Sequence, residues 1–303
     1  MAERGIHIVR AHLAKLPPSD SLTIAERRAQ YERAEKVFPT PPEVKVERVT
    51  VPTAPAEWLR PPSAAPGRVM LYLHGGGYVI GSPRSHRHLA AAIATAAGSS
   101  ALLLEYRCAP EAPFPAAVDD CWAATRYVAE HARELDVHGI ALGGDSAGGN
   151  LAATVALLAR DQNGPALAFQ LLIYPATDQR CATASHERNA QGYLLTRDAI
   201  QYFRRAYLPQ ESDWLDWRAS PLLAKSHANL PPAFVITAGF DPLLDEGRAY
   251  ADKLRAAGVE VAYREYADMV HGFVLFGGVL DTANAAVADC CSALRHAFES
   301  VAA

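Results

Sequence analysis

Cysteine is scarce in this sequence, which has five cysteines in 303 residues. No two of them have the Cys-x-x-Cys spacing of a zinc or redox site. The adjacent Cys290 and Cys291 lie on an expected helix, where their side chains point apart. We therefore expect free thiols in a reducing compartment, and neither a metal ion nor another cofactor.

Positive charge is also limited, because 29 lysines and arginines face 33 acidic residues, a net charge of −4. A nucleic-acid partner is not expected, since phosphate contacts need a basic face. Long apolar runs are missing too. The most apolar stretch, Leu89–Leu104, is rich in alanine and shorter than the roughly 20 residues that span a bilayer. The N-terminal residues lack a signal-peptide core, so we expect a cytoplasmic protein without a membrane span.

The sequence does contain short apolar runs that alternate with longer helical patterns. The candidate strands are Val44–Val51, Val69–Leu73, Ala101–Tyr106, Ile140–Leu142, Phe169–Tyr174, Phe234–Ala238 and Val261–Tyr266. The candidate helices are His86–Ala97, Ala116–Glu134, Ala147–Asp161, Asp245–Ala257 and Asp281–Phe298. This alternation predicts an α/β fold, with a mostly parallel, doubly wound sheet flanked by helices. The alternating polarity of the first strand is typical of a half-exposed edge strand.

Two segments do not fit this alternation. Residues 1–43 include a charged helical stretch over Thr23–Phe38, and residues of about 180–217 hold a second helical pattern, Arg197–Leu208, with several aromatic residues. Long insertions in compact domains are usually functional. We therefore expect both segments to form a small helical cap on the ligand edge of a domain over residues 44–303. The alternative is two unrelated surface excursions.

The strongest motif is Gly144-x-Ser146-x-Gly148, which lies between a predicted strand and an alanine-rich helix. The pattern is typical of a nucleophile elbow, a sharp turn that projects the serine hydroxyl at the edge of the sheet. The chain passes so close to itself there that the positions two before and two after the serine must lack a Cβ. A glycine-rich turn without chemistry is the alternative, but it leaves the flanking strand and helix unexplained.

A second glycine-rich motif, His74-Gly-Gly-Gly-Tyr78, follows the strand at 69–73. Consecutive glycines let backbone N–H groups converge on the oxygen that becomes negative during acyl transfer. The N–H of Ala147, just past the elbow, would be a further donor. A phosphate cradle is the alternative, but neither Gly-Lys-Ser/Thr nor Gly-x-Gly-x-x-Gly is present.

A serine nucleophile needs a base and a group that orients the base. One chain order known for such triads places the acid and then the histidine after the serine. Beyond position 241 the chain has only His271 and His296. His271 follows the last predicted strand, whereas His296 falls in the final helical pattern, where a packing role is simpler. We predict that His271 is the base.

Asp241 is the candidate acid. It follows the strand at 234–238, and Pro242 ends that strand, so Asp241 would lie at the same sheet edge as the serine and the histidine. Asp245 and Glu246 are rivals, but they open the following helix and more simply serve its N-terminal dipole.

Four further residues could suggest a metal cluster: His86, His88, Asp119 and Asp120. We interpret them instead as solvated faces at charged helix starts. Asp145, next to the serine, is expected to have a structural hydrogen-bonding role.

Five motifs in order resemble those of the bacterial hormone-sensitive-lipase-like (family IV) esterases and lipases, which have the α/β-hydrolase fold. The motifs occupy residues 74–78, 106–117, 144–150, 241–247 and 271–273. The resemblance spans residues 44–300. Cys108, where leucine is usual, and Ala112, in place of a common histidine, depart from the pattern.

The resemblance implies a serine carboxylesterase that hydrolyses short- to medium-chain esters through an acyl-enzyme, without a cofactor. It implies Ser146 as nucleophile with Asp241 and His271 as partners, and an oxyanion hole from Gly76, Gly77 and Ala147. It also implies a homodimer through the edge strand and last helices. An amidase or peptidase with the same triad is one alternative. A non-catalytic ligand receptor is another, although plant gibberellin receptors, which resemble the family, have lost the histidine that is present here.

Overall fold

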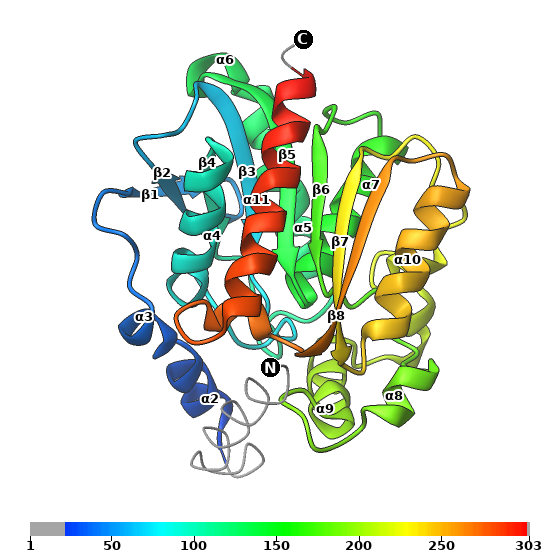
Figure 1. Ribbon diagram of the computed structural model, residues 1–303. Coiled ribbons are helices and arrows are strands. Elements are labelled where there is room, and N and C mark those ends of the chain that lie inside the picture. Colours follow the sequence, from blue (N-terminus) through cyan, green and yellow to red (C-terminus); the bar gives the residue numbers. More distant parts are fainter. Residues whose placement is uncertain (1–21, 302–303) are drawn as a thin grey trace.

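An eight-stranded sheet forms the centre of the protein, in a computed structural model that describes residues 22–301 (Figure 1). The strands are β1 (Lys45–Val51), β2 (Ala54–Arg60), β3 (Gly67–Leu73), β4 (Ser100–Leu104), β5 (Val137–Asp145), β6 (Phe169–Ile173), β7 (Ala233–Phe240) and β8 (Val261–Val270). Their order in the sheet is β1-β2-β4-β3-β5-β6-β7-β8. Only the β1–β2 and β2–β4 pairs are antiparallel. The predicted mostly parallel sheet is confirmed.

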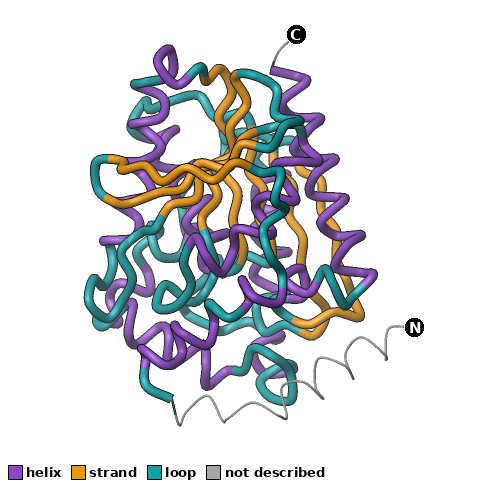
Figure 2. Tube along the Cα trace, turned by 90° about the vertical axis from the view of Figure 1, so that its left-hand side faces the viewer, coloured by secondary structure: helices purple, strands orange, loops and turns teal. Residues whose placement is uncertain are grey.

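Helices cover both faces of the sheet, as the sheet seen from the side of β1 and β2 makes clear (Figure 2). The helices are α2 (Ile24–Tyr31), α3 (Ala34–Val37), α4 (Pro83–Ala97), α5 (Ala116–Glu130), α6 (Ala132–Leu135), α7 (Ala147–Asp161), α8 (Ala184–Arg188), α9 (Arg197–Tyr207), α10 (Leu244–Ala256) and α11 (Asp281–Val301). Short 3-10 helices are η2 (Glu211–Leu215), η3 (Pro221–Leu223) and η4 (Phe273–Phe276). In the described part of the chain, no helix is both long and apolar enough to cross a membrane.

Two apolar cores lie on opposite faces of the sheet. In one, α4 packs against α11, and buried side chains such as Ile93 and Leu294 cover the strands. In the other, α5, α7 and α10 supply residues such as Val118, Leu151 and Leu254. Burial of apolar surface on both faces explains why the parallel strands read as near-continuous apolar runs in the sequence.

The sequence analysis missed β2. This strand contains Pro55 and Glu57 and has no β-branched residue, so it lacks the usual composition of a strand. It forms because its backbone pairs with β1 on one side and β4 on the other. The predicted edge strand is confirmed as β1, although most of its residues are exposed rather than alternating.

Several predicted boundaries also differ from the structure. The helix predicted over 116–134 is interrupted at His131, which separates α5 from α6. The charged stretch predicted over 23–38 divides into α2 and α3. Thr23 caps α2 in a capping box with Glu26. The part of the predicted cap in residues 1–21 lies outside the described residues.

The helices α2, α8 and α9 lie beyond the lower end of the sheet in Figure 1, where β5, β7 and β8 end. This is the edge where ligands bind in open parallel sheets. The candidate site residues therefore have to be sought between these strand ends and the helices of residues 22–43 and 180–217.

Candidate active site

Ser146 lies between β5, which ends at Asp145, and α7, which begins at Ala147. Its backbone has φ 56° and ψ −117°, a conformation that a residue with a side chain adopts only under strain. The neighbouring strand β6 holds this turn, because the N–H of Ser146 donates to the carbonyl oxygen of Ile173 at 2.8 Å. The turn therefore has the strand–turn–helix geometry that the motif predicted.

Glycine is required on both sides of the serine because neighbouring backbone atoms leave no room for a Cβ. A Cβ on Gly148 would lie 1.8 Å from the carbonyl oxygen of Leu73, the last residue of β3. A Cβ on Gly144 would lie 2.4 Å from the carbonyl carbon of Gly148. The start of α7 thus packs directly against the chain segment that enters the glycine-rich loop at 74–78.

The structure brings Ser146, His271 and Asp241 together. Nε2 of His271 is 2.9 Å from the Ser146 hydroxyl, and Nδ1 is 2.7 Å from a carboxylate oxygen of Asp241. Because a carboxylate can only accept, Nδ1 of His271 carries the ring proton and donates it in a hydrogen bond to Asp241. Nε2 is then free to accept a hydrogen bond from the serine hydroxyl. This arrangement can move the serine proton to the imidazole as the oxygen attacks an electrophile.

Asp241 is fully buried and its position is fixed on both sides. Its second carboxylate oxygen accepts a hydrogen bond from the N–H of Leu243 at 2.8 Å. Its backbone carbonyl accepts from the amide of Asn189 at 2.9 Å. The ring of Tyr174 lies 4.5 Å from the His271 ring, measured between ring centroids.

The glycine-rich loop folds back on itself next to the elbow. Gly76 has φ 117° and Gly77 has φ 61°, and the carbonyl of Gly76 accepts from the N–H groups of Val79 and Ile80. Such positive φ values are readily available only to glycine. Ala147, the remaining oxyanion candidate, is the first residue of α7, where backbone N–H groups have no helical partner.

Asp145 joins this loop to the sheet, which confirms its predicted structural role. One of its carboxylate oxygens accepts from the Tyr72 hydroxyl at 2.8 Å and from the N–H of Gly75 at 3.1 Å. Burial raises the pKa of Asp145, but the nearby His86, the hydrogen bond from Tyr72 and the nearby His74 together outweigh this and hold the pKa below its usual value. The carboxylate is therefore ionised when it holds the loop.

The interpretation of His86 and Asp120 as solvated residues is wrong, because both are fully buried. Nε2 of His86 lies 3.4 Å from Asp145, and Asp120 pairs with Arg107 at 2.7 Å. Their neighbours in the sequence are charged, but helix periodicity turns these two side chains inward. Within residues 22–301, no group of three or more His, Cys, Asp or Glu side chains could hold a metal ion.

Two histidines make stability dependent on pH: His74, buried at the start of this loop, and His88, partly buried on α4. Burial lowers the pKa of His74 to about 3 and that of His88 to about 4, whereas an unfolded chain binds these protons near pH ~6.5. Both depressed values favour the folded state above pH ~6.5, and this contribution is lost as the pH falls toward 4. We expect the free energy of urea unfolding to fall over this range, and the fall to be smaller in His88→Leu by on the order of 2 kcal/mol.

The exposed His296 supplies the control for this prediction. The variant His296→Gln should keep the slope of the wild type. Equal slopes for the wild type and His88→Leu would contradict the assignment of this pH dependence to His88.

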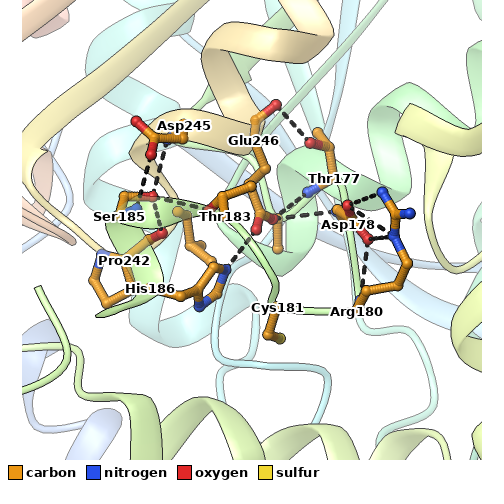
Figure 3. A network of polar contacts seen from close by, with 12 residues as sticks. Thr177, Asp178, Arg180, Cys181, Thr183, Ser185, His186, Pro242, Asp245 and Glu246 are labelled. Carbon is orange, nitrogen blue, oxygen red and sulfur yellow. Dashed lines mark hydrogen bonds and ion pairs between the residues drawn. The ribbon is translucent and has the colours of Figure 1, made fainter. Parts of the chain in front are cut away.

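A buried polar network attaches the start of the insertion to α10 (Figure 3). Glu246, 1% exposed, accepts from the N–H groups of Thr177 and Asp178 and lies 2.7 Å from Nε2 of His186. Ser185 donates to the carbonyl of Pro242, next to Asp241. Glu246 lies in the first turn of α10, as predicted, but the sequence did not indicate that its carboxylate also binds the insertion.

The insertion also contacts the backbone beside the other site residues. A Cβ on Gly77 would lie 2.4 Å from the Phe203 ring, and one on Gly272 would lie 3.3 Å from Leu194. The ring of Tyr193 stacks on Phe240 at 5.0 Å. The sequence identified the aromatic content of this segment, but it had no signal for which of these side chains reach the site.

Comparisons with known proteins agree with this architecture. A family model described as alpha/beta hydrolase fold matches residues 70–275. Carboxylesterase NlhH of Mycobacterium tuberculosis is 44% identical over 238 residues, which cover 77% of this chain and 74% of the relative. Ethyl acetate hydrolase of Pseudomonas putida is 40% identical, with 77% and 75% covered. The hyperthermophilic esterase of Pyrobaculum calidifontis has a similar structure, with a TM-score of 0.89, 36% identity, and 95% and 97% of the chains covered.

Proposed function

Because this chain belongs to the hormone-sensitive-lipase-like family of α/β hydrolases, we propose that it is a serine carboxylesterase that hydrolyses short- to medium-chain carboxylic esters. The observation that carries this proposal is the hydrogen-bonded series Asp241–His271–Ser146, with separations of 2.7 and 2.9 Å. The similar proteins named as esterases support it.

The proposed reaction has two stages. In the first, His271 takes the proton of Ser146 as the serine oxygen attacks the ester carbonyl, and it then donates that proton to the leaving alcohol. The backbone N–H groups of Gly76, Gly77 and Ala147 stabilise the negative oxygen of the tetrahedral intermediate. In the second stage, water activated by His271 attacks the acyl-enzyme and releases the acid.

We propose that α2, α3 and residues 180–217 act as the cap of this site. Phe203 lies against Gly77, one of the proposed oxyanion residues, and Leu194 lies against Gly272, next to the proposed base. Both side chains are therefore placed to limit the size of the acyl or alcohol group. A homodimer through the edge strand β8 and α11 is proposed from the family resemblance.

The five free cysteines are compatible with a reducing compartment, for which we propose the cytoplasm.

The test is a series of p-nitrophenyl esters from acetate to palmitate, with the corresponding acyl anilides in parallel. We expect kcat/KM to be highest for the shorter chains and to be far lower for the anilides, since an amine is a poorer leaving group than a phenol. Anilides cleaved as fast as esters would favour an amidase. Saturable ester binding without turnover would favour a receptor and contradict the proposal.

A further inference from the structure

Arg28 of α2 contacts the backbone that follows the glycine-rich loop. Its Nε donates to the carbonyl oxygen of Val79 at 2.8 Å, and Nη2 donates to the carbonyl oxygen of Ala109 at 2.9 Å. The outer edge of the guanidinium forms a two-bond pair with Glu111, at 2.9 and 2.7 Å. One side chain thus bridges two buried carbonyls and is itself oriented by a carboxylate.

The two carbonyls belong to one small backbone assembly. Val79 and Ala109 are both fully buried. The N–H of Ala109 donates to the carbonyl of Tyr78 at 2.8 Å, and the N–H of Val79 donates to the carbonyl of Gly76 at 3.2 Å. The turn at 76–80, which holds the proposed oxyanion glycines at its start, is therefore held at its far side by Arg28 and the Tyr78–Ala109 bond.

We propose that Arg28 is a positioning residue for the oxyanion hole, an inference that rests on the proposed esterase function. By holding Val79 and Ala109 at a fixed separation, the guanidinium keeps the turn in the conformation in which the N–H groups of Gly76 and Gly77 meet the developing oxyanion. Arg28 touches no reacting atom. Its effect is expected on the chemical step, with little effect on substrate binding.

The other contacts of α2 and α3 separate positioning from simple docking. Arg84 of α4 pairs with Glu32 at 3.2 Å and with Glu35 at 2.9 Å, so it also attaches this N-terminal segment to the domain. No hydrogen bond or ion pair of Arg84 within residues 22–301 involves the turn at 76–80. Arg84→Ala is therefore a matched control that weakens docking without altering the turn.

The experiment compares the full-length wild type, Arg28→Ala, Arg28→Lys and Arg84→Ala in the hydrolysis of p-nitrophenyl butyrate. Arg28→Ala should lower kcat by about 10- to 100-fold, less than the loss of an oxyanion donor itself, with KM changed less than about threefold. The rate of inactivation by a serine-directed phosphonate should fall in parallel. Arg28→Lys should be intermediate, since one ammonium group cannot bridge both carbonyls.

Guanidinium chloride at low millimolar concentration should restore part of the kcat of Arg28→Ala, whereas sodium chloride at the same concentration should not. This rescue also tests the inference if Arg28→Ala is less stable. A kcat of Arg28→Ala within threefold of the wild type, an equal loss in Arg84→Ala, or the same response to both salts would overturn the inference. An inactive wild type would instead contradict the proposed function.

Discussion

Replacing Ser146 with alanine is expected to lower kcat for ester hydrolysis by about four to six orders of magnitude. The change removes the oxygen that attacks the carbonyl, so no acyl-enzyme can form. Fold stability should change little, since the backbone strain at this position is the same for both residues and only one hydroxyl is lost. Steady-state kinetics and the thermal unfolding midpoint check these two expectations.

Two controls accompany this variant. A serine-directed phosphonate should label the wild type at one site and leave Ser146→Ala unlabelled. Ser63→Ala, which removes an exposed hydroxyl bound to the carbonyl of Thr95, should keep the activity of the wild type. If purified Ser146→Ala retained most of its activity, another residue would have to be the nucleophile.

Asp241→Asn is expected to lower kcat by about 10⁴-fold, through the tautomer of His271. The N–H of Leu243 donates to one carboxylate oxygen of Asp241, so an asparagine would place its amide oxygen there. The amide NH₂ would then face Nδ1 of His271, 2.7 Å from the replaced oxygen in the wild type. Nδ1 would become the acceptor, and Nε2 would carry the proton and could no longer accept one from the serine.

Asp245, an alternative candidate for the acid, provides the control for Asp241→Asn. Asp245 accepts from the N–H of Ser185 at 2.7 Å, so Asp245→Asn should affect attachment of the insertion and lower kcat less than tenfold. Asp252→Asn on the exposed side of α10 should have no effect. A greater loss in Asp245→Asn than in Asp241→Asn would show that the acid had been assigned to the wrong residue.

The sequence could predict that the candidate site residues come together, because their positions depend on local backbone constraints. A sharp turn from a strand into a helix requires glycine at the positions of Gly144 and Gly148, and this requirement appears in the sequence as a motif. Asp241 and His271 follow predicted strands, and parallel strands end at a common edge. The convergence of these two residues with Ser146 was therefore a consequence of topology, even though 95 residues separate Ser146 from Asp241 and 30 separate Asp241 from His271.

The sequence could not predict features that depend on tertiary contacts. Glu246 and His86 look like ordinary residues of helix starts, and only the folded chain shows that they pair with His186 and Asp145 in buried positions. The strand β2 likewise forms through its partners on both sides. Nothing in the sequence indicated the contacts of Arg28, because both of its carbonyl partners are backbone atoms more than 50 residues away.

The strand order has a consequence for how proteins with this architecture can diverge. Strand β6 lies between β5 and β7, so Ser146 and Asp241 stand two interstrand spacings apart, about 10 Å. That separation is set by backbone hydrogen bonds, which no side-chain replacement in residues 190–217 removes. The preference for one ester over another can therefore evolve, or be exchanged between relatives by grafting, while the proposed catalytic residues keep their alignment.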